Sequence, residues 1–475
     1  MVKPRAVVVG AGSAGCVLAS RVADRYDVVV IEAGRPVDAI GLPWAADDAS
    51  IAHPPTWSLP ALLTAGRRWR ATPGRAVGGS SVVNGGYLAV PVDLDLQRWH
   101  AAGGDAWRPD RVRSLAEQAG AGLGAQPSPQ THPVARAFAD AAAALGRKEG
   151  LLALDTTVHD GVVRSVAAAY LGQEISLRSD CRVLRVVIEA DRAVGVEVAD
   201  ADGIREVIAA DEVILCAGGF GTARVLLASG IGPADRLRAA GIDVVCDLAG
   251  VGAAFSDHPT VWVEWMPTTA LRTGDVHPED AFGAFPIALC VAVEGAPGDD
   301  LEILACTQPP DPVARNAPGA AAYGLIVGLQ RPVSRGTVVA TSAHPFASPT
   351  ISYGYLDDPI DRAAMRAGVR LAAELLQHPA FAGLVDRLVD LDTATLADDQ
   401  LLDAWVEARL GSAAHTCGTA PMGLDTDPLA VADGAGRVRG IAGLRIADTS
   451  LLPVVPSRGP AAAAMAVGAI IADQL

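Results

Sequence analysis

The stretch Ala6-Val7-Val8-Val9-Gly10-Ala11-Gly12-Ser13-Ala14-Gly15 decides the fold of the N-terminal part of this 475-residue chain. Residues 6–9 predict a short buried strand, and residues 16–22 predict an apolar helix after the glycine-rich turn. A second apolar run, residues 28–31, ends at Glu32. This order of strand, turn, helix, strand and acidic residue is the fingerprint of a dinucleotide-binding βαβ unit. A plain glycine-rich turn between packed elements fits the pattern less well.

The residue types of the fingerprint each have a physical task. Gly10 permits the tight turn, Gly12 lets the backbone approach a pyrophosphate, and Gly15 lets the helix pack on the strand. The start of the helix offers free N–H groups and a partial positive charge to the phosphates. The carboxylate of Glu32 is placed to accept hydrogen bonds from a ribose diol, which argues against a 2′-phosphate.

A second glycine-rich segment runs from Gly74 to Gly86. So many glycines and small polar residues predict a loop whose backbone lies close to another group. Flexible linkers rarely interleave valines with their glycines, whereas this segment contains Val77, Val82 and Val83. The segment therefore favours a binding loop over a linker.

Eight short motifs follow one another along nearly the whole chain. They are Gly78-Gly79-Ser80-Ser81 with Asn84-Gly85 and Arg98-Trp99; Ser229-Gly230-Ile231-Gly232-Pro233; Asp247-Leu248 with Gly250-Val251-Gly252; Ser256-Asp257-His258-Pro259; Ser334-Arg335-Gly336; His415 with Gly418-Thr419; Met422-Gly423; and Gly443-Leu444-Arg445 with Asp448 and Ser450. Each motif alone is weak evidence, but the eight in this order resemble the glucose-methanol-choline (GMC) oxidoreductases.

This resemblance implies the fold class and the chemistry. The fold would be α/β, with a Rossmann-type FAD-binding domain and a second α+β substrate domain made of an antiparallel sheet with helices. The activity would be FAD-dependent oxidation of an alcohol to a carbonyl compound, with hydride transfer to flavin N5. A dehydrogenase is favoured over an oxidase, although O2 stays open as the electron acceptor.

The fingerprint and the resemblance together assign the residues that bind FAD. They are Gly10, Gly12, Ser13, Ala14, Gly15, Glu32, Ala33, Gly78, Ser81, Asn84, Gly85, Val183, Asp448, Pro460 and Ala461. Val183 resembles a residue whose backbone contacts adenine, and a plain core strand explains it equally well. Some relatives link FAD covalently through a histidine at the position of Val83, and valine cannot form that bond, so we expect non-covalent FAD.

The resemblance also places the catalytic residues. A neutral histidine suits the base that takes the hydroxyl proton, and the family's base corresponds here to His415. The family's second polar residue, histidine or asparagine, corresponds to Gly459, which has no side chain. Three interpretations stay open. His415 works alone, or Arg458 or a residue of the substrate domain contributes, or the chain is catalytically weakened.

The segment Ser457-Arg458-Gly459-Pro460 resembles the GMC dehydrogenases of the mycofactocin system. In that group a histidine would follow the proline, whereas this chain has Ala461. Proline favours the first position of a helix, so residues 460–472 predict a buried helix. Its positive N-terminus, at Gly459 and Pro460, would face the flavin edge that becomes negative on reduction.

Apolar periodicity predicts the remaining organisation. We expect strands at residues 182–188, 193–198, 212–217 and 260–265, and helices at residues 219–229 and 359–376. We expect the FAD-binding domain in three parts, residues 1–150, 179–258 and 405–475. Residues 151–178 would form a border segment, and residues 259–404 would form the substrate domain.

Composition limits the partners. A net charge of −16 argues against nucleic acid. Seven scattered cysteines without a CxxC pair are typical of reduced thiols in the cytoplasm, and the nine histidines show no metal-binding spacing. No apolar run reaches the ~20 residues that span a bilayer. We therefore expect a cytoplasmic enzyme without metal or transmembrane segment; attachment to the inner-membrane surface stays open.

Two function classes remain. The first is an alcohol dehydrogenase, with mycofactocinol as one candidate substrate and a quinone-linked chain or O2 as acceptor. The second is a flavoprotein with no net redox turnover, such as a lyase or a protein that keeps FAD for structure. The bare Gly459 favours the second class, and the complete motif around His415 favours the first.

Overall fold

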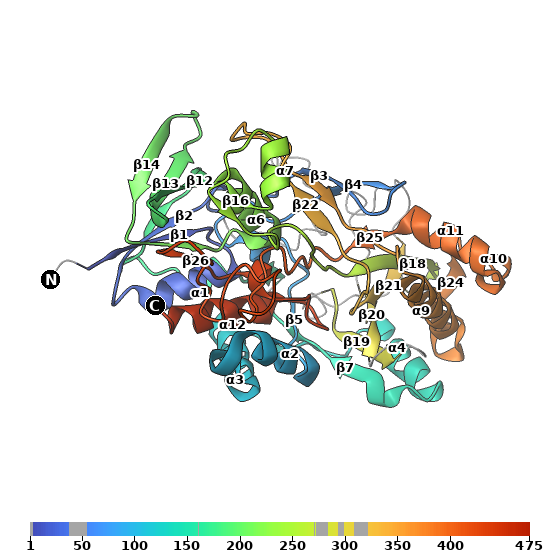
Figure 1. Cartoon of the computed structure of the whole chain (residues 1–475). Helices are drawn as coiled ribbons and strands as arrows, with labels where there is room; N and C mark the ends of the chain where they lie inside the picture. Colours follow the sequence, from blue (N-terminus) through green and yellow to red (C-terminus); the bar gives the residue numbers. More distant parts are fainter. Residues whose placement is uncertain are drawn as a thin grey trace.

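A parallel five-stranded sheet forms the N-terminal side of the molecule (Figure 1). The computed structural model describes residues 3–37, 55–159, 161–269, 271, 284–292, 299–307 and 322–475. The strand order is β11-β2-β1-β15-β26, and every neighbouring pair is parallel. The strands are β1 (Arg5–Val9), β2 (Asp27–Ile31), β11 (Ser176–Arg178), β15 (Glu212–Leu215) and β26 (Leu444–Ile446). Helix α1 (Ser13–Val22) connects β1 to β2, which confirms the predicted strand–turn–helix–strand unit.

The three strands predicted at residues 182–188, 193–198 and 212–217 are present and divide between two sheets. β12 (Arg182–Glu189), β13 (Arg192–Ala199) and β14 (Arg205–Ala209) pair antiparallel with one another. A tight turn with positive φ at Ala190 and Asp191 reverses the chain, so β12 and β13 form a hairpin. Of the three predicted strands, only β15 joins the parallel sheet, and β13 packs against it.

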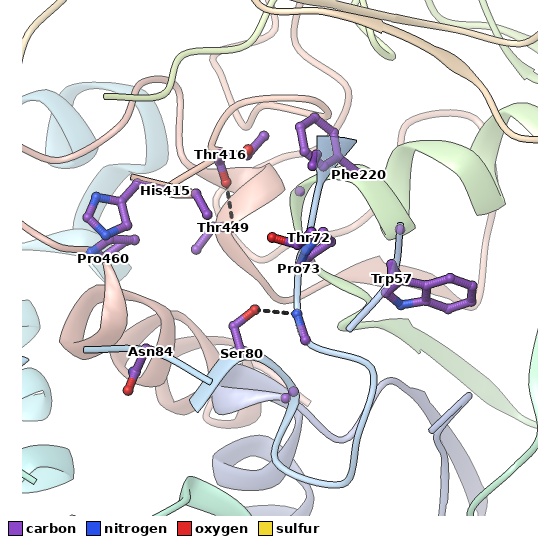
Figure 2. A pocket seen from close by; sticks show the side chains of 18 of the residues that line it. Trp57, Thr72, Pro73, Ser80, Asn84, Phe220, His415, Thr416, Thr449 and Pro460 are labelled. Carbon is purple, nitrogen blue, oxygen red and sulfur yellow. Dashed lines mark hydrogen bonds between the residues drawn. The ribbon is translucent and has the colours of Figure 1, made fainter. Parts of the chain in front are cut away.

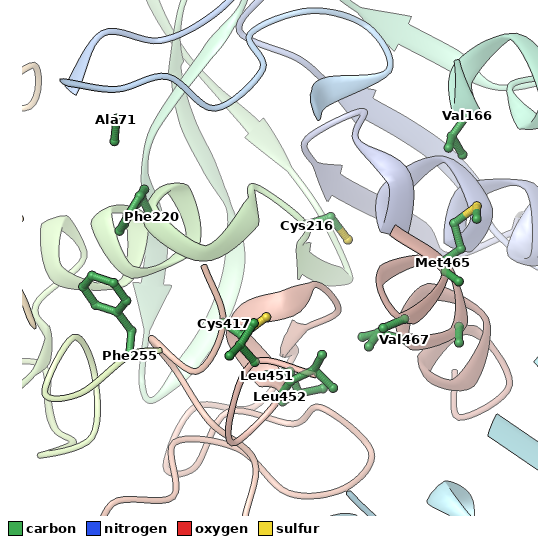
Figure 3. Close-up of a cluster of buried hydrophobic side chains, with 14 of the residues drawn as sticks. Ala71, Val166, Cys216, Phe220, Phe255, Cys417, Leu451, Leu452, Met465 and Val467 are labelled. Atoms are coloured by element: carbon green, nitrogen blue, oxygen red, sulfur yellow. The ribbon is translucent and has the colours of Figure 1, made fainter. Parts of the chain in front are cut away.

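Helices α1, α3 (Pro109–Leu123) and α12 (Ala461–Ala472) pack together beside the parallel sheet. Every residue of α12 from Ala462 onward is buried, which confirms the predicted buried helix. The helix begins at Ala461 rather than at Pro460, which caps it through its carbonyl oxygen to the amide of Ala464. Figure 3 shows Val467 of α12 on the side of Leu451 and Leu452, and Met465 of the same helix on the side of Val166. Phe220 of α6 (Gly218–Ala228) belongs to the same buried cluster.

A second, antiparallel sheet forms the other side of the molecule. Its order is β24-β18-β21-β20-β19-β7, and β25 also pairs with β18. The strands are β7 (Leu151–Ala153), β18 (Pro259–Pro267), β19 (Ile287–Ala292), β20 (Asp299–Ala305), β21 (Tyr323–Leu329), β24 (Val385–Leu388) and β25 (Gly411–Ser412). Helix α9 (Pro359–Gln377) packs across β20 and β21. This sheet therefore includes short strands from before residue 259 and after residue 404.

Smaller elements complete the described part of the chain. One further sheet has the order β22-β23-β3-β4 and another β5-β8-β6. Their strands are β22 (Thr337–Val339), β23 (Thr350–Ser352), β3 (Leu59–Leu62), β4 (Arg68–Ala71), β5 (Tyr87–Leu88), β8 (Asp155–Thr156) and β6 (Gln126–Pro127). The other helices include α2 (Asp93–Gly103), α4 (Pro133–Ala144), α5 (Val166–Tyr170), α7 (Ala234–Ala239), α10 (Thr393–Ala397) and α11 (Asp399–Arg409).

No described helix combines the length and the apolar composition that crossing a membrane requires. Within the same residues, no three histidine, cysteine, aspartate or glutamate side chains gather as a metal site. All seven cysteines lie in the described part, and none of them is joined to another by a disulfide.

Candidate active site

A cavity of about 620 Å³ extends from the glycine-rich turn after β1 to His415 (Figure 2). Its walls come from both large sheets and from the loops between them. Most of the predicted site residues line it: Gly10, Gly12, Ser13, Ala14, Glu32, Ala33, Ser81, Asn84, Gly85, Val183, His415, Asp448, Gly459, Pro460 and Ala461. The structure thus brings together residues that are more than 400 positions apart in the sequence.

The glycine-rich end of the cavity suits a dinucleotide. A Cβ added at Gly10 would lie 2.4 Å from the carbonyl oxygen of Cys216, and one added at Gly79 would lie 2.7 Å from the Cα of Gly12. Two backbone segments therefore meet here without side chains, as close approach to a pyrophosphate requires. The N-terminus of α1 faces the same space and favours the phosphates.

The buried carboxylate of Glu32 stands at the end of β2. Its oxygens accept hydrogen bonds from the amides of Ala11, at 3.0 Å, and Gly34, at 2.8 Å. Burial raises the pKa of Glu32, and these amide donors oppose the rise. Each carboxylate oxygen has a second lone pair, so Glu32 can hold its own loop and still accept a hydrogen bond from a ribose hydroxyl.

Two other predicted cofactor residues, Asp448 and Ser81, hold loops in place through their side chains. Asp448 accepts hydrogen bonds from the amide of Gly218 and the hydroxyl of Thr222. Ser81 donates to the carbonyl of Gly78 at 2.6 Å. The polar atoms of both side chains already have hydrogen-bond partners within the protein. The two side chains therefore shape the wall of the cavity.

Three of the predicted site residues do not reach the wall of the cavity: Gly15, Gly78 and Arg458. Gly15 serves helix packing as predicted, because a Cβ there would lie 2.1 Å from the carbonyl oxygen of Gly10. The buried guanidinium of Arg458 instead lies 3.8 Å from a carboxylate oxygen of Glu302 and donates to the carbonyl of Ser457.

The N-terminus of α12 also lies on the cavity wall. Proline has no amide hydrogen, so Pro460 contributes no N–H group to this end of the helix. The free N–H groups at this end belong to the first helical residues, from Ala461 onward. The helix dipole still places partial positive charge here.

His415 projects into the cavity from the loop after β25 (Figure 2). The buried carboxylate of Asp257 organises this loop. It accepts hydrogen bonds from the amide of His415 at 2.9 Å, the hydroxyl of Thr416 at 2.7 Å and the amide of His258 at 2.7 Å. Burial raises the pKa of Asp257 to about 6 despite these three donors.

A second histidine determines which nitrogen of His415 carries a proton. The Nε2 of His258 lies 3.0 Å from the carbonyl oxygen of Pro456, and its Nδ1 lies 2.9 Å from the Nδ1 of His415. The carbonyl can only accept, so Nε2 of a neutral His258 carries the hydrogen and its Nδ1 accepts. His415 must then donate from Nδ1, which leaves Nε2 of His415 unprotonated and available as a base.

Burial keeps both imidazoles neutral. It lowers the pKa of His415 to about 4. Burial, followed by the charge of a protonated His415, holds the pKa of His258 well below 6.5. A base of this kind is neutral over the whole physiological range.

We expect the rate constant for flavin reduction to rise with pH through about 4 and to stay level above about pH 5. Protonation of His415 below that pKa occupies the base, so the rate should fall about tenfold for each further pH unit. Anaerobic stopped-flow reduction after a jump to each pH measures the profile. A midpoint near 6.5 would contradict the burial argument.

Several residues of this site are not predicted from the sequence. His258 stands within a motif that assigns it no role, and no motif contains Tyr87 or Glu302, which both line the cavity. The Asp257-His258 pair directly before a predicted strand is the sequence feature that could have identified His258 as a site residue. Nothing in the sequence pattern marks Tyr87 or Glu302, because they arrive from separate strands, β5 and β20.

The chain matches two family models, both described as GMC oxidoreductase, over residues 5–260 and 332–468. The chain belongs to the GMC oxidoreductase family. It is 33% identical to an uncharacterised GMC-type oxidoreductase of Rhodococcus erythropolis, over 97% of this chain and 96% of the relative. It is 30% identical to the oxygen-dependent choline dehydrogenase of Vibrio vulnificus, over 95% and 90% of the two chains.

Solved structures show the same fold. Pyridoxine 4-oxidase from Mesorbium loti superposes with a TM-score of 0.87 at 25% identity, covering 99% of each chain. A formate oxidase superposes with a TM-score of 0.88 at 23% identity, covering 100% of this chain and 98% of the other. This GMC oxidoreductase is therefore an FAD-dependent enzyme with an FAD-binding domain and a substrate domain.

Proposed function

We propose that this GMC oxidoreductase oxidises an uncharged alcohol with apolar substituents to the corresponding carbonyl compound. The observation that carries the proposal is the chain of hydrogen bonds from Pro456 through His258 to His415, which leaves Nε2 of His415 as a neutral acceptor. Bound FAD would accept the hydride that leaves the carbinol carbon. His415 takes the hydroxyl proton, since an alkoxide transfers hydride far more readily than an alcohol does.

The wall around the substrate end of the cavity supports the choice of substrate. Trp262, Phe285, Leu304 and Ile326 supply apolar surface there. The buried Glu302 is opposed by Arg458 at 3.8 Å, so this carboxylate offers a weak site for a cationic substrate. Apolar walls also exclude water, which strengthens each remaining hydrogen bond to the reacting oxygen.

The alcohol-oxidation proposal is tested by anaerobic mixing with a panel of primary alcohols of increasing apolar size, with choline and mycofactocinol included. We expect bleaching of the oxidised flavin spectrum by at least one uncharged alcohol. A protein that binds FAD but is reduced by no member of the panel would overturn the alcohol proposal.

The resemblance of Ser457-Arg458-Gly459-Pro460 to mycofactocin-system dehydrogenases supports mycofactocinol as a candidate substrate. In that case electrons would pass to a quinone-linked chain, with O2 as the alternative acceptor.

We also propose a cytoplasmic location, with attachment to the inner-membrane surface as the alternative. We place the domain boundaries at residues 150, 178, 258 and 404, as the order of the motifs indicates.

We propose that FAD is held without a covalent bond. Val83 lines the cavity, and its side chain offers no nucleophile to the flavin. Denaturation and filtration should therefore release all of the yellow chromophore from the purified protein. Flavin absorbance that stays with the polypeptide would contradict this prediction.

The bare Gly459 and the adjacent Ala461 favour a second candidate, a flavoprotein without net redox turnover. No side chain from either position donates to a substrate oxygen. The alcohol panel separates the two candidates, since a lyase or a structural flavoprotein would leave the flavin oxidised with every alcohol.

A further inference from the structure

Tyr87 packs directly against the bare backbone of Gly459. A Cβ added at Gly459 would lie 2.7 Å from the hydroxyl oxygen of Tyr87 and 3.0 Å from its Cζ. Both distances are shorter than a van der Waals contact between such atoms. The phenol therefore fills the space that a side chain at position 459 would occupy.

The surrounding structure fixes the position of this ring. Tyr87 begins β5, which pairs with β8 through the register Tyr87–Thr156. The ring of Phe285 meets that of Tyr87 edge to face, with centroids 6.0 Å apart and planes at 79°. This geometry stabilises an aromatic pair and restricts the rotamers of the tyrosine.

Among the residues that the structure describes, none forms a hydrogen bond with the hydroxyl of Tyr87. Tyr87, His415 and Gly459 line the same cavity. Burial, reinforced by the negative charge of Glu302, holds the pKa of Tyr87 well above 10. The phenol thus keeps its proton at every pH at which the enzyme would work.

We propose that the hydroxyl of Tyr87 donates a hydrogen bond to the reacting oxygen of the substrate. This inference rests on the proposed alcohol oxidation and names the second polar group of that site. The substrate proton goes to Nε2 of His415, and Tyr87 keeps its own proton. The donated hydrogen bond strengthens as negative charge grows on the substrate oxygen, so it favours the transition state over the ground state.

The first test removes only the hydroxyl. Tyr87→Phe should lower the limiting rate constant of flavin reduction about 10- to 100-fold, the usual effect of losing one hydrogen bond to a charged group. The apparent dissociation constant of the alcohol should change much less, and the FAD content should not change. Tyr323→Phe is the matched control, because this buried tyrosine of β21 does not line the cavity.

The second test needs no cofactor and no turnover. Gly459→Ala should lower the midpoint of thermal unfolding of the apoprotein by a few degrees, because the new methyl group meets the phenol. In a Tyr87→Ala background the same substitution should have little effect. Additive effects in this double-mutant cycle would show that the two residues are not in contact and would overturn the proposal.

The outcomes separate this inference from the proposed function. If no alcohol reduces the flavin of the wild-type enzyme, alcohol oxidation fails and the role of Tyr87 fails with it. If alcohols reduce the wild-type flavin and the Tyr87→Phe variant reacts at the wild-type rate, only the role of Tyr87 fails. Alcohol oxidation and the role of Tyr87 are both supported if two results are found. The Tyr87→Phe variant must react more slowly with its normal FAD content, and the effects of Gly459→Ala and Tyr87→Ala on thermal unfolding must not be additive.

Discussion

Replacing His415 with alanine should lower the rate constant of flavin reduction by an alcohol about 10²- to 10⁴-fold, the usual contribution of a general base. The variant should still bind FAD, because the hydrogen bonds between His415 and the rest of the protein hold a loop and not the glycine-rich end of the cavity. Anaerobic stopped-flow mixing measures the rate constant, and absorbance at saturation measures the FAD content.

His344→Ala is the matched control, since this histidine is exposed and lies outside the cavity wall. It should react at the wild-type rate. Flavin reduction at an unchanged rate in the His415→Ala variant would show that another group takes the proton. Loss of FAD from that variant would instead show that the loop also shapes the cofactor site.

Replacing Gly12 with alanine should weaken FAD binding about 10- to 100-fold, in line with the overpacking cost of about 1–3 kcal/mol for one extra methyl group. The backbone of Gly12 is extended, with φ of −83°, so alanine is compatible with it. A Cβ there would meet only the Cα of Gly79, at an ordinary 3.9 Å. We therefore expect the methyl group to crowd bound FAD and to leave the apoprotein unstrained.

Titration of the apoprotein with FAD, followed by quenching of flavin fluorescence, measures this loss. The midpoint of thermal unfolding without FAD should stay close to the wild-type value. Gly383→Ala is the matched control, because its added Cβ would meet nothing within 4 Å. Wild-type affinity in the Gly12→Ala variant would contradict the close approach of the pyrophosphate at this turn.

Local sequence pattern predicted much of this fold because its elements depend on neighbouring residues. The β1–α1–β2 unit, β15 and the buried helix α12 all appear where apolar periodicity placed them. The pattern could not assign β12 and β13 to a sheet. A strand carries the same alternation whichever sheet it joins, and the choice depends on pairing with distant segments.

The same limit applies to the site. His415 could be identified from its motif, but its tautomer depends on His258 and on the carbonyl of Pro456, which lie 157 and 41 positions away in the chain. The sequence predicts that Gly459 leaves the second polar position empty, with Arg458 or a residue of the substrate domain as the substitute. The structure turns Arg458 toward Glu302 and places Tyr87 in the gap.

Local sequence spacing was enough to specify the dinucleotide-binding turn, because the glycines and the acid after the second strand lie within one βαβ unit. The order of eight short motifs along the chain indicated the GMC oxidoreductase family. Only the folded chain brings His258 against His415 and Tyr87 against Gly459. Hydrogen bonds and close packing act over a few ångströms in space, and residues such as Tyr87 and Gly459 meet only after the chain has folded.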